Sequence, residues 1–201
     1  AWALALLTRC PSDMLSAWIV DDGPKAGHSY AMTVDFAGRT KNRDATVISV
    51  FDMTENAQVC LVSIRDMAPP DQLHWIDGVK TAYGCEELHG DNTPEGAALM
   101  AYLRERHGAG IRGHVFSSHN KALYVKRAQF LFEMAEVRLI DCPYQRREFK
   151  DFRRIASESK SGLDGPVSYS HPPGKHDDTV AAFLQIAPSM AHGRRAEAQA
   201  D

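Results

Sequence analysis

The sequence lacks several features that would assign a protein to a class at once. Its four cysteines, in 201 residues, form no C-x-x-C pair, so neither a zinc ribbon nor a disulfide framework is predicted. The apolar opening, residues 1–7, is too short to cross a bilayer and lacks the basic lead-in and cleavage site of a signal peptide. We therefore expect a protein of a reducing, cytoplasmic compartment with no membrane partner.

A strong excess of one charge is also missing. Lys and Arg total 23 and Asp and Glu total 26, which gives a formal net charge of −3. A nucleic acid would therefore have to be bound by a local basic patch or through metal ions. The phosphate-binding loop G-x-x-x-x-G-K-[ST] does not occur, so this chain is not expected to hydrolyse ATP.

The residues that are present suit one globular domain, since 44% are hydrophobic. Residues 1–27 end in a run of turn formers, and we expect them to be a linker or the remnant of a preceding region. The domain itself is expected at residues 28–190. The polar end of the chain, residues 191–201, is predicted to be a disordered tail.

The hydrophobic pattern predicts an α/β fold. Three runs rich in β-branched and aromatic residues, at 30–37, 45–52 and 58–65, are separated by short polar turns and predict an antiparallel meander. After Pro69 and Pro70 the period becomes helical, and helices and strands then alternate. This order predicts a mixed sheet with helices on both faces. One of the predicted helices covers residues 144–157.

Acidic residues stand at the ends of several predicted elements. Asp35 lies near the end of the first apolar strand, Asp91 lies between a short strand and a helix start, and Asp177 and Asp178 begin the last helix. Each has an ordinary explanation when taken singly, as a turn former or as a charge that suits a helix N-terminus.

Taken together, these acids favour a metal site. In a mixed sheet the first strand can lie beside the strand that follows the crossover helix, which brings Asp35 and Asp91 to one end of the sheet. A final helix packed there adds Asp177 or Asp178. Carboxylates gathered in this way repel unless divalent cations lie between them, and Mg²⁺ and Mn²⁺ prefer oxygen ligands. The sequence thus predicts a phosphoryl-transfer site.

Three segments carry a family resemblance. Residues 30–48 resemble the opening motif of the nuclease domain of tailed-phage terminase large subunits, residues 90–96 resemble its second acidic motif, and residues 176–183 resemble its closing motif. The second motif departs from the usual Asp-Ser-Thr-Gly type, which leaves Glu86, Glu87 and Glu95 as fallback ligands. The resemblance covers about residues 28–188. It implies an RNase H-like fold and a metal-dependent endonuclease that cuts concatemeric viral DNA during genome packaging.

The resemblance also implies residue roles. Two Mg²⁺ or Mn²⁺ ions would be held by Asp35, which bridges them, and by Asp91 and Asp178, with Asp177 as the alternative to Asp178. Asp44 and His176 are auxiliary candidates, although Asp44 is equally well explained as a turn residue and His176 as a helix-start residue. The implied partners are double-stranded DNA, the portal protein, the small terminase subunit and the packaging ATPase domain, which is not found in this sequence.

Basic residues provide candidate DNA contacts, although a solvated charged face is the commoner explanation for such a pattern. The candidates are Arg146, Arg147, Lys150, Arg153 and Arg154 on one side of the predicted helix 144–157, and Lys121 in the preceding helix. Two other functions remain open at this point. One is a resolvase- or transposase-type nuclease of the same fold, and the other is a non-catalytic DNA-guiding or portal-docking module.

Overall fold

The computed structural model describes residues 15–20, 23–37, 45–156 and 167–191. The predicted tail therefore lies almost wholly outside the described residues, as does Asp44. None of the described helices combines the length and hydropathy that a membrane span requires.

A six-stranded mixed sheet forms the centre of the molecule, with the strand order β1-β4-β3-β2-β5-β6. Strands β2, β3 and β4 form the predicted antiparallel meander, β1 pairs antiparallel with β4, and β5 and β6 run parallel to β2. The strands are β1 (Leu15–Ile19), β2 (Tyr30–Asp35), β3 (Thr46–Asp52), β4 (Ala57–Ile64), β5 (Glu87–Asp91) and β6 (Ile111–His114).

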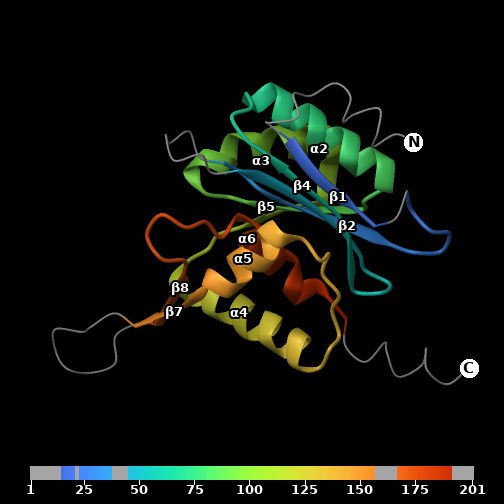
Figure 1. Ribbon diagram of the computed structural model, residues 1–201. Helices are drawn as coiled ribbons and strands as arrows, with labels where there is room; N and C mark the ends of the chain where they lie inside the picture. The colour runs from blue at the N-terminus through green and yellow to red at the C-terminus, as the bar shows by residue number, and fades with distance from the viewer. Residues whose placement is uncertain (1–14, 21–22, 38–44, 157–166, 192–201) are drawn as a thin grey trace, which may run out of the picture.

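Helices cover both faces of this sheet, as Figure 1 shows. The helices α2 (Pro69–Tyr83) and α3 (Pro94–His107) lie on one face, and α4 (Ser118–Glu133), α5 (Pro143–Asp151) and α6 (Asp178–Ile186) lie on the other. A separate hairpin of β7 (Arg153–Ala156) and β8 (Val167–Ser170) packs next to α4. The predicted α/β class, with a mixed sheet and helices on both faces, is confirmed.

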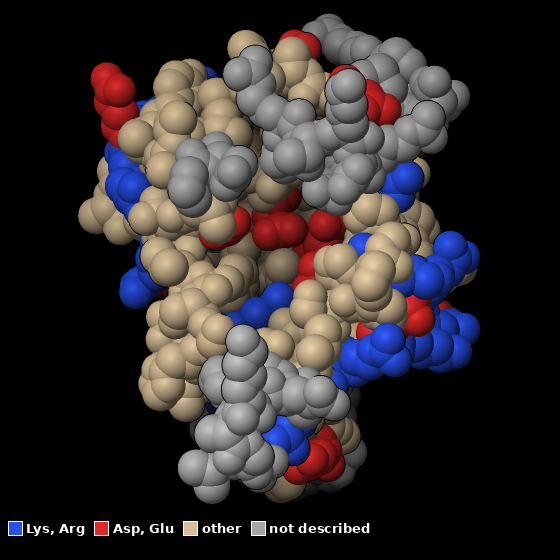
Figure 2. Space-filling model, turned by 90° about the vertical axis from the view of Figure 1, so that its left-hand side faces the viewer, with Lys and Arg blue, Asp and Glu red and all other residues tan. Residues whose placement is uncertain are grey.

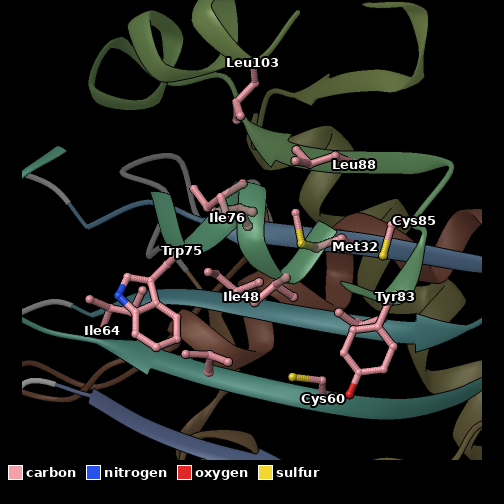
Figure 3. Packing of buried hydrophobic residues seen from close by; sticks show 14 of the residues in the cluster. Met32, Ile48, Cys60, Ile64, Trp75, Ile76, Tyr83, Cys85, Leu88 and Leu103 are labelled. Atoms are coloured by element: carbon pink, nitrogen blue, oxygen red, sulfur yellow. The ribbon is translucent and has the colours of Figure 1, made fainter. Parts of the chain in front are cut away.

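The alternation of side chains along the strands divides the core in two. Met32 and Ile48 point toward α2 and α3, where they pack with Trp75, Ile76 and Leu88 (Figure 3). Phe51 faces the opposite way and packs against α4 and α6. All nine residues of α6 are buried. Helix α6 is thus enclosed by the sheet on one side and by α4 and α5 on the other, which fixes its N-terminus in place.

Two elements differ from the sequence prediction. Leu15–Ile19 was expected to precede the domain, yet it forms the edge strand β1 because its backbone completes the hydrogen bonding of β4. The helix predicted at 144–157 ends at Asp151, and Phe152 is extended. Arg153–Ala156 then pairs with Val167–Ser170 as a hairpin, and this strand pairing outweighs the local helix preference.

Candidate metal centre

The two strand-end acids lie next to each other because of the sheet register. Val34 of β2 pairs with Gly90 of β5, and the two strands are parallel. The next residues along these strands are Asp35 and Asp91, so their backbones leave the sheet at the same end. This is the end of the sheet where a parallel arrangement exposes side chains and loops to a ligand.

Helix α6 brings the third acidic position to this end. Asp178 is 9% exposed, and its Oδ2 accepts hydrogen bonds from the backbone N–H of Ala45 (3.1 Å) and from the Tyr144 hydroxyl (3.2 Å). Glu148 of α5 caps the helix, since its carboxylate accepts from the backbone N–H (2.7 Å) and the hydroxyl (2.6 Å) of Thr179. The direction of Asp178 is therefore set by α5 and by the start of β3.

The acids interact strongly with one another. Burial raises the pKa of Asp35 well above its usual range, and the neighbouring carboxylates of Asp178, Asp91 and Asp177 raise it further, in that order of strength. Lys121 partly opposes the rise. In Figure 2 acidic side chains gather in a hollow in the middle of one face of the molecule, with basic side chains close by. Like charges kept this close are costly unless a cation lies among them.

The donor set fits a hard divalent cation. It consists of carboxylate oxygens from three separate elements, and these are the ligands that Mg²⁺ and Mn²⁺ prefer. Among the described residues, only His28, Asp52 and Glu55 place three ligand atoms all within 4.8 Å of one another, and these three lie elsewhere.

That second group is a network of hydrogen bonds and ion pairs. His28 Nδ1 lies 2.6 Å from Asp52 Oδ2, and Asp52 Oδ1 accepts from the backbone N–H groups of Thr54 and Glu55. Glu55 in turn pairs with Arg138 and with Lys25. Asp52 pairs with Tyr30 at the beginning of β2, so this network lies at the opposite end of the sheet from Asp35.

Asp91 also shapes its own loop. Its carboxylate accepts from the backbone N–H (3.0 Å) and the hydroxyl (2.9 Å) of Thr93, so the turn-forming explanation holds alongside any metal role. Gly96 allows α3 to start close to this loop, because a Cβ at Gly96 would lie 2.4 Å from the carbonyl oxygen of Asp91.

The other candidates from the sequence are His176 and the acids Asp44, Glu86, Glu87 and Glu95. His176 is half-buried and directly precedes Asp177. The carboxylate of Glu87 pairs with His89 Nε2 (3.1 Å) and with Arg112 Nη2 (2.5 Å). Glu86 is exposed. The side chain of Glu95, like the whole of Asp44, lies outside what the structure describes.

The candidate DNA-binding residues do not form one helix face. Arg146, Arg147 and Lys150 are exposed on α5, and Arg146 pairs with Asp141, whereas Arg153 and Arg154 lie on β7. Lys121 lies in the acid cluster, with its Nζ 3.2 Å from Asp177 Oδ2. Within the described part of the chain, Arg147, Lys150, Arg153 and Arg154 form no recorded ion pair. These four residues are therefore available to an external phosphate.

The sequence reasoning missed two residues that support the site, Tyr144 and Glu148. They lie four residues apart on α5 and reach the N-terminus of α6 side by side. Burial, together with the carboxylates of Asp178 and Glu148, raises the pKa of the Tyr144 hydroxyl far above its usual range, so it remains a hydrogen-bond donor. The one available signal was this i, i+4 spacing of a tyrosine and an acid among the basic residues of α5.

Comparisons with known proteins identify the fold. No protein-family model matches the sequence, and a search of curated proteins finds no match. Among solved structures, the large terminase nuclease from the thermophilic phage G20c with bound magnesium matches with a TM-score of 0.74 at 22% identity, covering 86% of each chain.

Nuclease domains from other phages are also similar. The nuclease domain of the large terminase subunit gp2 of the bacterial virus Sf6 matches with a TM-score of 0.59 at 10% identity, covering 81% of this chain and 89% of that one. The nuclease domain of the large terminase from bacteriophage SPP1 with bound Mn matches with a TM-score of 0.50 at 14% identity, covering 86% and 99%. The chain therefore has the fold of these large terminase nuclease domains.

Proposed function

We propose that this chain is the nuclease domain of a phage terminase large subunit, a metal-dependent endonuclease that cuts concatemeric viral DNA during packaging. The observation that carries the proposal is the convergence of Asp35, Asp91 and the Asp177–Asp178 pair at one end of the sheet, close enough to raise the pKa of Asp35. The fold supports it, because similar nuclease domains have been solved with bound magnesium and with bound Mn.

Each residue in and around the acid cluster would have its own role. Asp35, at the centre of the cluster, would face both ions, while Asp91 and Asp178 would each hold one. Divalent ions bound there would lower the pKa of a water molecule and stabilise the charge that develops on the phosphate. Tyr144 and Glu148 would keep Asp178 in position, and Thr93 would do the same for Asp91. His176 is a further candidate for orienting a carboxylate or a water molecule.

DNA would be bound through its backbone. Arg147 and Lys150 on α5 and Arg153 and Arg154 on β7 are exposed basic residues on the side of the sheet that carries α6. Backbone contacts carry no sequence information, so little sequence preference is expected. In the full packaging machinery the domain would act with the packaging ATPase domain, the portal protein and the small terminase subunit.

Cleavage of plasmid DNA tests the proposal. The purified chain should nick and linearise supercoiled plasmid in the presence of Mn²⁺ or Mg²⁺ and should stop when EDTA is added. Asp35→Asn and Asp91→Asn should each lower the rate at least about 100-fold, since a metal ligand is lost. Glu105→Gln removes an exposed carboxylate near the far end of α3 and should leave the rate unchanged.

Three results would contradict the proposal. Full cleavage by both folded aspartate variants would mean that the site is elsewhere. Divalent-ion and DNA binding without any cleavage would instead favour a non-catalytic DNA-guiding module. A preference for branched DNA over linear duplex would favour a resolvase-type nuclease.

A further inference from the structure

Arg65 is a half-buried arginine that directly follows β4. Building on the proposed function, we infer that Arg65 binds the DNA substrate: its guanidinium group holds a backbone phosphate next to the one that is cut. This contact fixes the position of the DNA strand over the acid cluster without touching the metal ions.

The sheet register places Arg65 at the same end of the sheet as the acid cluster. Ile64, the last residue of β4, pairs with Thr46 at the start of β3. The next residue of β3, Val47, pairs with Asp35. Two strand spacings, about 10 Å in all, therefore separate the end of β4 from the end of β2. Arg65 thus lies beside the acids and not among them.

Arg65 also lies on the face of the sheet that carries α5 and α6. Side chains alternate along a strand, so Arg65 shares a face with Leu61, which belongs to the same core cluster as Ala182 of α6. The guanidinium carbon lies 5.6 Å from the centroid of the Tyr144 ring on α5. The hydroxyl of this tyrosine donates to Asp178 (3.2 Å), so one aromatic side chain joins Arg65 to the acid cluster.

The Tyr144 ring is a fixed platform for the arginine. Trp18 of β1 stacks with it, with ring centroids 6.4 Å apart and 17° between the two planes. The hydrogen bond to Asp178 holds the hydroxyl end of the same ring. A guanidinium group stacked on an aromatic ring has lost part of its freedom before a ligand arrives. Arg65 is therefore preorganised, which lowers the entropic cost of binding a phosphate.

The charge of Arg65 has no acidic partner within ion-pair distance in the described part of the chain. Several other arginines do pair with carboxylates, namely Arg106, Arg112, Arg138 and Arg146. The side chain of Arg65 is recorded with the tyrosine ring instead. An aromatic ring holds the guanidinium plane but leaves its N–H groups able to donate, and their fork matches two oxygens of a phosphate. The ligand that suits this arrangement is a backbone phosphate of DNA bound at the acid cluster.

Two measurements test the inference: steady-state cleavage of a linear duplex in Mn²⁺, and fluorescence anisotropy of duplex binding in Ca²⁺ at several salt concentrations. Arg65→Gln should raise KM about tenfold and change kcat by less than about threefold, because the lost contact is to a phosphate that does not react. The slope of log affinity against log salt concentration should fall by about one, since one phosphate contact is lost.

Two further variants serve as controls. Arg65→Lys keeps the positive charge, so it should keep the wild-type salt slope and recover most of the loss in KM. Arg106→Gln removes an arginine of α3 that pairs with Asp77, and it should change neither KM nor the slope.

Calorimetric titration with Mn²⁺ separates DNA binding from a merely structural role. If Arg65 only supports Tyr144, Arg65→Gln should weaken Mn²⁺ binding and leave the salt slope unchanged, and this result would overturn the inference. A wild-type KM and slope in folded Arg65→Gln would overturn it as well, as would a reduced slope in Arg65→Lys.

The outcomes also separate this inference from the proposed function. If the wild-type protein binds duplex DNA but cuts none, the proposed function fails, while the salt slope still decides the role of Arg65. A wild-type protein that cuts DNA together with an unchanged Arg65→Gln variant leaves the proposed function standing and overturns only the role of the arginine. A wild type that binds no DNA contradicts both.

Discussion

Asp35 is the residue at which stability and function oppose each other. Its carboxylate lies among three others, and burial together with their charges raises its pKa well above the usual value. The folded chain thus binds a proton there more readily than the unfolded chain does. The stability that Asp35 contributes is present at low pH and is lost as the pH rises through the raised pKa.

Removing this charge should therefore stabilise the metal-free protein. At pH 7.5 in EDTA we expect Asp35→Asn to raise the unfolding temperature by a few degrees, because a repulsive charge is replaced by a neutral group of the same shape. Thermal unfolding followed by circular dichroism measures this shift. With saturating Mn²⁺ the order should reverse, since only the wild type gains from binding. A lower unfolding temperature for Asp35→Asn in EDTA would contradict the account.

A pair of histidines, His89 buried and His114 half-buried, links β5 to β6. His89 Nδ1 lies 2.8 Å from His114 Nε2, and the outer nitrogens meet Glu87 (3.1 Å) and the Tyr124 hydroxyl (3.2 Å). The contact between the two rings needs one donor and one acceptor, so the two rings cannot both be protonated, and burial lowers the pKa of His89. Burial lowers the pKa of His114 to about 4, with His89 and Arg112 adding to the effect.

This lowered pKa predicts acid sensitivity. The unfolded chain takes up a proton on His114 near pH 6.5, whereas the folded chain does so only near pH 4. The free energy of unfolding should therefore fall between pH 6.5 and 4, by about 1–2 kcal/mol from this residue. Urea unfolding at pH 7.5, 5.5 and 4.5 measures the fall. His114→Asn should be less stable at pH 7.5 but show a flatter dependence, whereas His119→Asn, on the exposed side of α4, should follow the wild type.

At the scale of elements, the start of α3 packs tightly against the loop that carries Asp91. Gly96→Ala should be destabilising, although alanine normally favours a helix, because the new methyl group would overlap the carbonyl oxygen of Asp91 at 2.4 Å. We expect a loss of about 1–3 kcal/mol in urea unfolding. Weaker Mn²⁺ binding should accompany it, since Asp91 must shift. A stabilised variant with unchanged metal affinity would show that α3 does not constrain Asp91.

The elements that could be predicted from the sequence are those whose residue pattern is complete within one short segment. The meander from β2 to β4 follows from β-rich runs separated by short turns, and α3 and α6 follow from helix-start residues before apolar repeats. β1 and β7 could not be predicted in this way, because their strand conformation depends on pairing with β4 and β8, and those partners lie outside the local segment. The prediction that a helix continues through Arg153 was wrong for the same reason.

At the scale of the whole molecule, the same limit applies to the site. Asp35, Asp91 and the Asp177–Asp178 pair could be named because each stands at a predicted element end and within a family-like motif. Tyr144, Glu148 and the inward position of Lys121 could not, since they depend on how α4 and α5 pack around α6. Sequence patterns thus indicate the candidate metal ligands more readily than the residues that keep those ligands in position.

The distribution of basic residues predicts how DNA binds. Replacing both Arg153 and Arg154 by Gln should weaken the binding of linear duplex DNA. It should also reduce the slope of log affinity against log salt concentration by about two, if each arginine neutralises one phosphate. Fluorescence anisotropy at several salt concentrations measures the slope. Arg106→Gln, on α3, should leave it unchanged, and an unaltered slope in the double variant would exclude β7 from the DNA-binding surface.

The central claim is that acids from β2, β5 and α6 meet to hold divalent cations. Anomalous diffraction at the manganese edge from crystals grown with Mn²⁺ tests it most directly. The account predicts two anomalous peaks bounded by the carboxylates of Asp35, Asp91 and Asp178. Peaks found only elsewhere, for example at His28, Asp52 and Glu55, or no peaks at all under saturating Mn²⁺, would contradict it.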